Sequence, residues 1–282
     1  LHRAALAIWA AGLAAAVAGY LWMHALGDEA RRGAGACAEP ATGRLPSCTA
    51  LETITADETY ATGIALISTA LAWLCLPVAA WAGAALTGRE LESGTIRLAW
   101  TQSTGPVRWL AVQLAVPAAL LTTGAAGLVL LNRWARGDGD PDLVGDWYNA
   151  DVFISTGPAA LAYPLAGLAL GALAGLYLGR TLPAAGTALA AILLLSTLLD
   201  HTRELLWPAV TRSAPERFEL PRSAFQLSWD TTTATDGSPT VTATFHPGSH
   251  FWPLHLMETG IVLAVAVLAV TAAFALVRRR TA

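Results

Sequence analysis

Residues 88–109 read GRELESGTIRLAWTQSTGPVRW and form a charged link between two long apolar runs, residues 62–86 and residues 109–131. Four further apolar runs occupy residues 4–26, 157–178, 183–199 and 259–277. Each run is long enough, or nearly so, to cross about 30 Å of hydrocarbon as a helix. The pattern predicts an all-α polytopic membrane protein with six transmembrane helices. The charged link offers a docking surface to a soluble partner.

The composition supports a membrane protein and excludes several functions. Hydrophobic residues make up 55% of the chain and charged residues 13%, whereas an ordinary soluble domain is about 25% charged. All 17 basic residues are Arg. Without Lys the chain has no Walker A loop and no Schiff-base or Ser-Lys chemistry. We therefore expect no cofactor on this chain, and the net charge of −3 gives no indication of a nucleic acid partner.

The distribution of Arg predicts the orientation. With the N-terminus inside, the inside segments hold eight Arg and two acidic residues, whereas the outside segments 27–61, 132–156 and 200–258 hold nine Arg and eighteen acidic residues. The inside segments are much shorter, so their Arg density is far higher. The positive-inside rule then places both termini in the cytoplasm and the chain in the plasma membrane.

Two cysteines share the first outside segment. Cys37 and Cys48 have ten residues between them. An oxidising compartment favours a disulfide, which would contribute roughly 3 kcal/mol on the chain-entropy estimate. Two free thiols remain the alternative. Cys75 falls within the second span, where we expect it to pack as a small apolar residue.

The segment 200–258 is long enough to fold outside the membrane. Residues 225–229 and 241–245 alternate apolar and polar side chains, and Asp236-Gly237 between them is a turn signal. The pattern predicts a small extracytoplasmic insertion that contains a β-hairpin. A metal site could be formed by Asp200, His201, His246, His250 and His255. However, no HExxH or CxxC spacing is present, so we predict hydrogen-bonding roles and no metal.

Two features of the spans suggest specific roles. Glycine recurs every fourth residue at Gly167, Gly171, Gly175 and Gly179, which lets another helix approach closely. We favour a partner helix in the same chain, with a second chain as the alternative. Glu258 begins the last span, after Trp252. A carboxylate there is either a boundary anchor or part of the exit of a transport path, so Glu258 and Trp252 are candidate gating residues.

The run GRELESGTIRLAWTQS, followed by Arg108-Trp109, and the run HFWPLHLMETG at 250–260 resemble the membrane subunits of actinobacterial ABC-2 type ABC transporters. The six-span order extends the resemblance over nearly the whole chain. It implies a type V exporter-like fold. Two membrane subunits, either two copies of this chain or this chain and a related permease, would form the path within membrane lipid. Two separate ABC ATPase subunits would dock below and bind ATP and Mg, so this chain would not be an enzyme by itself.

The resemblance also implies that the link between the second and third spans, residues 88–108, couples to the ATPase. The matching positions are Arg89, Glu90, Leu91, Glu92, Thr95, Arg97 and Trp100. The residue types agree with a docking role. Apolar side chains among close opposite charges can supply the apolar anchors and the polar rim of a protein–protein interface. A solvated loop that forms its own salt bridges is the alternative.

The sequence thus predicts the transmembrane subunit of an ATP-driven exporter for an amphipathic small molecule, peptide or lipid. A non-transporting sensor or immunity subunit with the same fold is the main alternative. A membrane-embedded enzyme is disfavoured, because the predicted spans contain no nucleophile–base pair.

Overall fold

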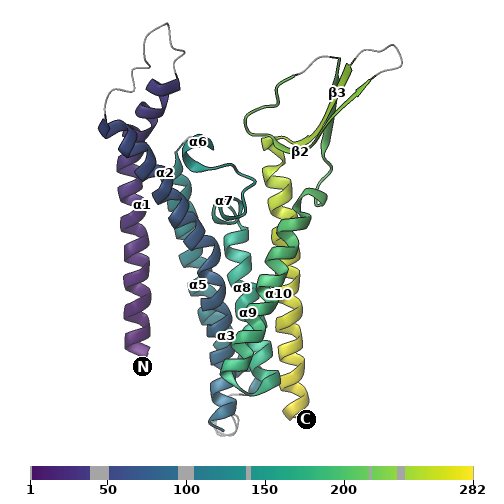
Figure 1. The fold of residues 1–282 in the computed structure, drawn as a ribbon. Helices are drawn as coiled ribbons and strands as arrows, with labels where there is room; N and C mark the ends of the chain where they lie inside the picture. Colours follow the sequence, from purple (N-terminus) through teal and green to yellow (C-terminus); the bar gives the residue numbers. More distant parts are fainter. Residues whose placement is uncertain are drawn as a thin grey trace.

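The structure is a computed structural model that describes residues 2–38, 51–94, 105–137, 141–215, 218–233 and 239–281. These parts of the chain are mostly helical (Figure 1). Six helical segments are long and apolar enough to cross a membrane: Ala10–Arg32, Ala56–Glu92, Pro106–Arg136, Ala159–Leu178, Thr181–Leu205 and Gly248–Arg280. Each overlaps one predicted run, which confirms a helical chain with six candidate spans.

The second span is built from two helices. The first four long helices are α1 (His2–Ala38), α2 (Leu51–Trp73), α3 (Cys75–Glu92) and α5 (Pro106–Arg136). The sequence predicts one continuous run at 62–86, but the helix is interrupted at Leu74. Pro77 explains the break, because a proline has no N–H and its ring clashes with the carbonyl four residues earlier, here that of Trp73.

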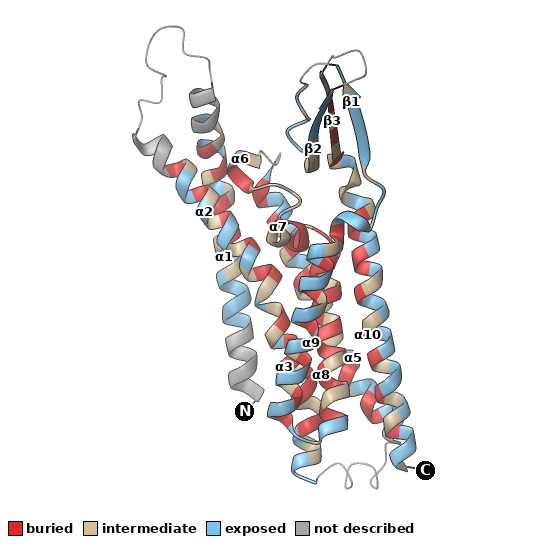
Figure 2. Cartoon of the chain, turned by 45° about the vertical axis from the view of Figure 1, so that its right-hand side comes forward, coloured by how far each residue is buried: buried red, intermediate tan, exposed pale blue. Residues whose placement is uncertain are grey.

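Helix α8 (Ala159–Leu178) lies at the centre of the bundle. It follows the short helices α6 (Pro141–Val144) and α7 (Ala150–Ser155), and α9 (Thr181–Thr202) with the 3₁₀ turn η1 (Arg203–Leu205) comes next. Most of α8 is buried against α3, α5, α9 and α10 (Figure 2). A helix that is apolar on all faces is expected to be enclosed in this way.

A three-stranded antiparallel sheet precedes the last helix. It consists of β1 (Val210–Ala214), β2 (Phe225–Thr233) and β3 (Pro239–His246), in the order β1-β3-β2. The predicted strands at 225–229 and 241–245 lie within β2 and β3, whereas β1 was not predicted. The turn signal at Asp236-Gly237 lies outside the described residues. The turn η2 (Gly248–His250) then leads into α10 (Phe251–Thr281).

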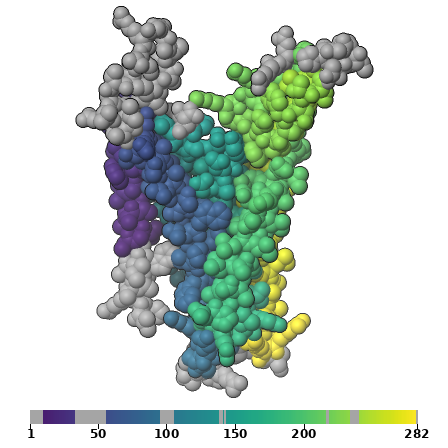
Figure 3. All heavy atoms as spheres, viewed as in Figure 1, coloured from purple at the N-terminus to yellow at the C-terminus, as the bar shows by residue number. Residues whose placement is uncertain are grey.

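The molecule has two distinct ends along the helix axes (Figure 1). The start of α1, the end of α10, the end of α3 and the start of α5 all lie at one end, which we call the terminal end. The sheet, α6 and α7 lie at the opposite end, which we call the sheet end. Figure 3 shows that the surface at the sheet end is hollowed between α1–α2 and the sheet.

Candidate functional site

The charged residues at the end of α3 contact neighbouring helices of the same chain. Glu90 Oε1 accepts a hydrogen bond of 3.2 Å from Gln113 Nε2 on α5. Leu91 packs against the apolar cluster that contains Trp109 and Leu110, also on α5. Arg89 is exposed. The end of α3 is therefore fixed against the start of α5 by one polar contact and one apolar contact.

Glu92 caps a different helix. Its Oε1 accepts a hydrogen bond of 2.8 Å from the backbone N–H of Thr181, and its Oε2 accepts one of 3.0 Å from Thr181 Oγ1. Thr181 is the first residue of α9, where the backbone N–H groups have no partner within the helix. A carboxylate is favoured at this positive end of the helix dipole. Glu92 thus joins the end of α3 to the start of α9.

For the remaining three predicted coupling residues the structure gives no position. Thr95, Arg97 and Trp100 lie outside the described residues. The described part of the terminal end nevertheless carries exposed arginines on three helices and in the turn between α8 and α9: Arg89, Arg108, Arg180, Arg279 and Arg280.

Three glycines of α8 face α3. A Cβ at Gly167 would lie 3.4 Å from the Ala80 nitrogen, and a Cβ at Gly171 would collide with the Ala80 carbonyl oxygen. A Cβ at Gly175 would collide with Thr87 Oγ1. The two backbones are in direct contact, and the helix that meets this glycine face belongs to the same chain. Thr87 Oγ1 donates a 3.0 Å hydrogen bond across the contact to the Ala172 carbonyl.

Gly179 has a different role from the other three. It is the C-cap of α8, with a φ of 64°, and nothing lies within 4 Å of the position its Cβ would take. The left-handed conformation favours glycine at the end of a helix. Gly179 therefore continues the four-residue spacing but lies in a turn and not in the helix contact.

Glu258 belongs to a buried polar cluster at the sheet end. Its side chain has 0% exposure, and it pairs with Arg203, whose side chain is 3% exposed. Arg203 Nε donates to Glu258 Oε2 at 3.0 Å, and the Tyr163 hydroxyl donates to Glu258 Oε1 at 2.8 Å. Both carboxylate oxygens are thus satisfied, by groups from η1 and α8.

Arg203 holds together several elements around this pair. Its Nη1 contacts Asp200 Oδ1 at 3.0 Å and donates to the Tyr148 carbonyl at 3.2 Å. Its guanidinium carbon lies 4.0 Å from the centroid of the Phe153 ring, a cation–π contact. Burial and the neighbouring Asp146 raise the pKa of the Tyr148 phenol, whose ring stacks on Phe225 of β2. The sheet and the helices therefore meet at this cluster.

Comparison with known families identifies the chain. The profile of a family described as ABC-2 membrane transporter related matches residues 6–203, well over half of the chain. The chain belongs to this family. The predicted resemblance to ABC-2 type permeases is therefore confirmed. No curated protein and no solved structure matches the chain.

Family membership gives the coarse function. An ABC-2 protein is a multi-pass membrane component of an ABC transporter and is not itself an enzyme. Members of the family generally work with an ABC ATPase partner. The matched region runs from α1 to the start of η1, so it contains the junction between α3 and α5.

The buried pair changes the interpretation of Glu258 in this ABC-2 protein. Glu258 is a candidate exit residue because a carboxylate at a membrane edge needs water or a partner. The structure supplies the partner, Arg203, within the chain. That argument therefore no longer supports an exit role, and Glu258 is better interpreted as an anchor that joins α8, η1 and α10. Trp252 is 46% exposed and lies near Arg133 of α5.

The five potential metal ligands do not come together. His246 Nδ1 and His250 Nδ1 are 3.0 Å apart, but His255 stacks on Phe153 and places Nε2 at 2.6 Å from the Phe153 carbonyl oxygen. His201 bonds to the Thr197 carbonyl of its own helix, and Asp200 pairs with Arg203. Among the described residues, no three potential ligands are grouped around one point.

The predicted disulfide falls where the structure gives no side-chain description. Cys48 lies outside the described residues, and the side chain of Cys37, near the end of α1, is not described. Cys75, the first residue of α3, is a partly buried free thiol beside α2.

Proposed function

We propose that this ABC-2 protein is the transmembrane subunit of an ATP-driven exporter with a type V exporter-like fold. It forms part of a translocation path that moves an amphipathic small molecule, peptide or lipid outward. Family membership and the six candidate spans support a transporter subunit. The orientation and the coupling rest on the arguments below, and the outward direction rests on the resemblance to exporter subunits.

The contacts of α3 with its neighbouring helices at the terminal end are the main support for coupling to an ATPase. Glu90 ties the end of α3 to α5, and Glu92 ties it to α9. The glycine face packs α3 directly against α8. A partner that pushes on the link between α3 and α5 would therefore move several packed helices together. Packed side chains and rigid helices of this kind can carry energetic coupling between distant sites.

The charge of the terminal end fits a cytoplasmic position. Exposed arginines lie on α3, α5 and α10 and in the turn before α9, and the nearby Glu90 and Glu92 are engaged within the chain. The positive-inside rule assigns such an end to the cytoplasm, where an ATPase can reach it. Both termini would then be cytoplasmic, and the sheet would be extracytoplasmic.

The complete transporter would contain four subunits. Two ABC ATPase subunits would bind ATP and Mg below the terminal end. A second copy of this chain, or a related permease, would form the other half of the path. Membrane lipid would surround the exposed apolar faces of α5 and α10, such as Leu120 and Val267.

Reversal of charge at Arg89 tests the docking surface. Glu90 and Glu92 are poor probes, because their contacts within the chain would be broken as well. Arg89 is exposed, so Arg89→Glu should leave the fold intact. We expect it to weaken co-purification with the ABC ATPase by about 1 kcal/mol or more, depending on how far the partner buries it.

The matched control is Arg212→Glu, which reverses an exposed arginine on β1 at the sheet end. Equal recovery of the ATPase with the Arg89 variant and with the control would refute docking at the end of α3. Nucleotide-dependent transport by the reconstituted complex then separates an exporter from a sensor, which would respond to a compound without moving it.

A further inference from the structure

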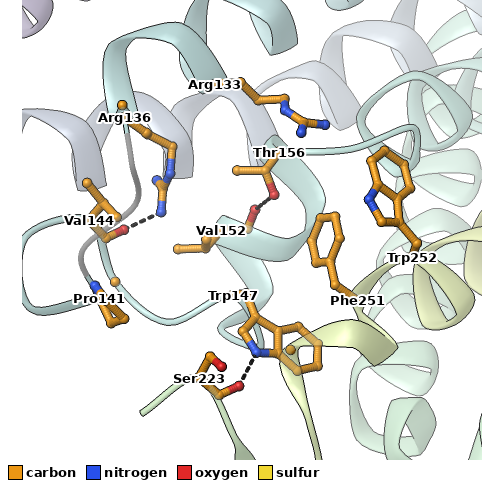
Figure 4. A pocket seen from close by; sticks show the side chains of 13 residues that line it. Arg133, Arg136, Pro141, Val144, Trp147, Val152, Thr156, Ser223, Phe251 and Trp252 are labelled. Atoms are coloured by element: carbon orange, nitrogen blue, oxygen red, sulfur yellow. Dashed lines mark hydrogen bonds between the residues drawn. The ribbon is translucent and has the colours of Figure 1, made fainter. Parts of the chain in front are cut away.

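A pocket at the sheet end has the features of an anion site. It has a volume of about 400 Å³ and lies between the end of α5, the α6–α7 region and the start of α10 (Figure 4). This volume is within the ordinary range for small-molecule sites. Arg133 and Arg136 supply two guanidinium groups, and Trp147, Phe251 and Trp252 supply aromatic walls.

Neither guanidinium has a carboxylate partner among the described residues. Arg136 is 6% exposed and donates to two neutral groups, Ser68 Oγ at 3.1 Å and the Val144 carbonyl. Arg133 is exposed, and its guanidinium carbon lies 5.5 Å from the centroid of the Trp252 ring. Arg31, which approaches the same region at Gly137, is already paired with Asp28. Asp151 acts electrostatically on Arg136 but forms no ion pair with it, and its Oδ2 accepts a hydrogen bond from Thr69. The buried charge of Arg136 is therefore only partly compensated, and an anion in contact with it would be favoured.

The aromatic residues give the pocket a fixed shape. Trp147 Nε1 donates a 2.6 Å hydrogen bond to the Ser223 carbonyl, which holds the indole at the edge of the pocket. Phe251 packs edge-on against Trp147, and Trp252 packs edge-on against Phe251. These contacts fix the positions of the three aromatic side chains that line one side of the pocket (Figure 4).

Exposed apolar residues continue below the pocket along both flanking helices. Leu130 lies three residues before Arg133 on α5 and is 68% exposed. Leu256 lies four residues after Trp252 on α10 and is 61% exposed. Residues three or four apart share one face of a helix, so each leucine lies one turn deeper in its span than the pocket residue above it. The surface is thus cationic and aromatic at the membrane boundary and apolar beneath it.

We propose that this pocket binds the headgroup of an anionic phospholipid, with an acyl chain along Leu130 and Leu256. Arginine suits phosphate because its planar fork can donate two parallel hydrogen bonds. Tryptophan is enriched at the headgroup level of membranes, which is where the ends of α5 and α10 would lie. The site does not depend on docking of an ATPase, so its test is independent of the proposed function.

Native mass spectrometry of the full chain tests this site. The purified protein is titrated with phosphatidylglycerol and with phosphatidylcholine. We expect tighter binding of phosphatidylglycerol, and Arg133→Gln should weaken it roughly five- to tenfold while leaving phosphatidylcholine unchanged. Arg133→Lys, which keeps the charge, should recover part of the preference. Arg32→Gln is the matched control, because Arg32 is an exposed arginine at the sheet end of the α1 span and does not line the pocket.

Three results would overturn the proposal. They are equal affinity for the two lipids, an undiminished preference in Arg133→Gln, and an equal loss in Arg32→Gln. Inorganic phosphate is added in a parallel titration. If inorganic phosphate binds the wild-type chain as tightly as phosphatidylglycerol does, the acyl chain contributes nothing, the pocket holds a free anion and the lipid assignment is wrong. The Arg133 variant is expected to fold, because its side chain is exposed.

Discussion

At the scale of single residues, the buried pair of Arg203 and Glu258 is the most consequential feature. Sequence position alone made Glu258 a candidate for the exit of a transport path, because an acid at the edge of an apolar helix must be solvated or paired. The pairing partner is 55 residues away in the chain, so no local pattern could identify it. Tyr163, on α8, is a further residue that sequence reasoning missed.

Glu258→Gln removes the charge but keeps the shape of the side chain. Loss of one partner of a buried ion pair typically costs 3–5 kcal/mol, and we expect about 3 kcal/mol because Asp200 still contacts Arg203. Unfolding by a denaturing detergent in mixed micelles measures the change. Asp200→Asn is the matched control, since that carboxylate is 39% exposed and should cost at most about 1 kcal/mol. Equal costs for the two variants would show that the buried pair has no special role.

The predicted bond between Cys37 and Cys48 also belongs to this scale. If both cysteines lie in an oxidising compartment, the intact mass under non-reducing conditions should be two hydrogens below that of the reduced chain. Reduction should then lower the stability by roughly 3 kcal/mol. Alkylation of both thiols without a reductant would argue against the bond and against an extracytoplasmic position for this segment.

At the scale of elements, the terminal end shows how helices are held together by groups from elsewhere in the chain. The start of α9 receives its cap from Glu92 of α3, and α8 receives α3 against its glycine face. The four-residue glycine spacing could predict a close helix contact but not the identity of the partner helix. The same spacing could not distinguish Gly179, which ends α8, from the three glycines that face α3. A glycine at the end of a helix and a glycine on its face occupy equivalent positions in a four-residue repeat.

Glu92→Ala should destabilise the start of α9. It removes two hydrogen bonds to Thr181, and the loss of a capping carboxylate typically costs about 1 kcal/mol. Hydrogen exchange of the amides in the first turn of α9 should therefore be faster, with little change in α10. Glu29→Ala, at an exposed acid on α1, is the control. Unchanged exchange at Thr181 would mean that the cap contributes nothing.

Gly171→Ala tests the close approach of α3 and α8. A methyl group there would collide with the Ala80 carbonyl oxygen, so the helices must move apart. We expect a destabilisation of about 1–3 kcal/mol, the usual range for overpacking. Gly186→Ala, at an open position on α9, should be neutral or stabilising by up to about 1 kcal/mol. Thermal unfolding in detergent compares the two, and equal midpoints would contradict the packing described here.

At the scale of the whole molecule, the sequence could predict the number of spans because hydrophobic length depends only on local composition. It could also predict the strand segments within β2 and β3, since side-chain alternation is local as well. It missed β1, a five-residue strand that exists because it pairs with β3. The predicted fifth span, 183–199, lies within the longer helix α9, because backbone hydrogen bonding continues the helix to Thr202 after the apolar run ends.

We propose that this membrane subunit transports only together with a separate ATPase. The most direct measurement is ATP hydrolysis by the purified chain alone and by the chain reconstituted with its cognate ABC ATPase. We predict none for the chain alone, because it has no Lys and no phosphate-binding loop. We predict hydrolysis for the complex, lost when the Walker A lysine of the ATPase is replaced. Hydrolysis by the chain free of any partner, or failure of the two proteins to form a complex in membranes, would contradict the claim.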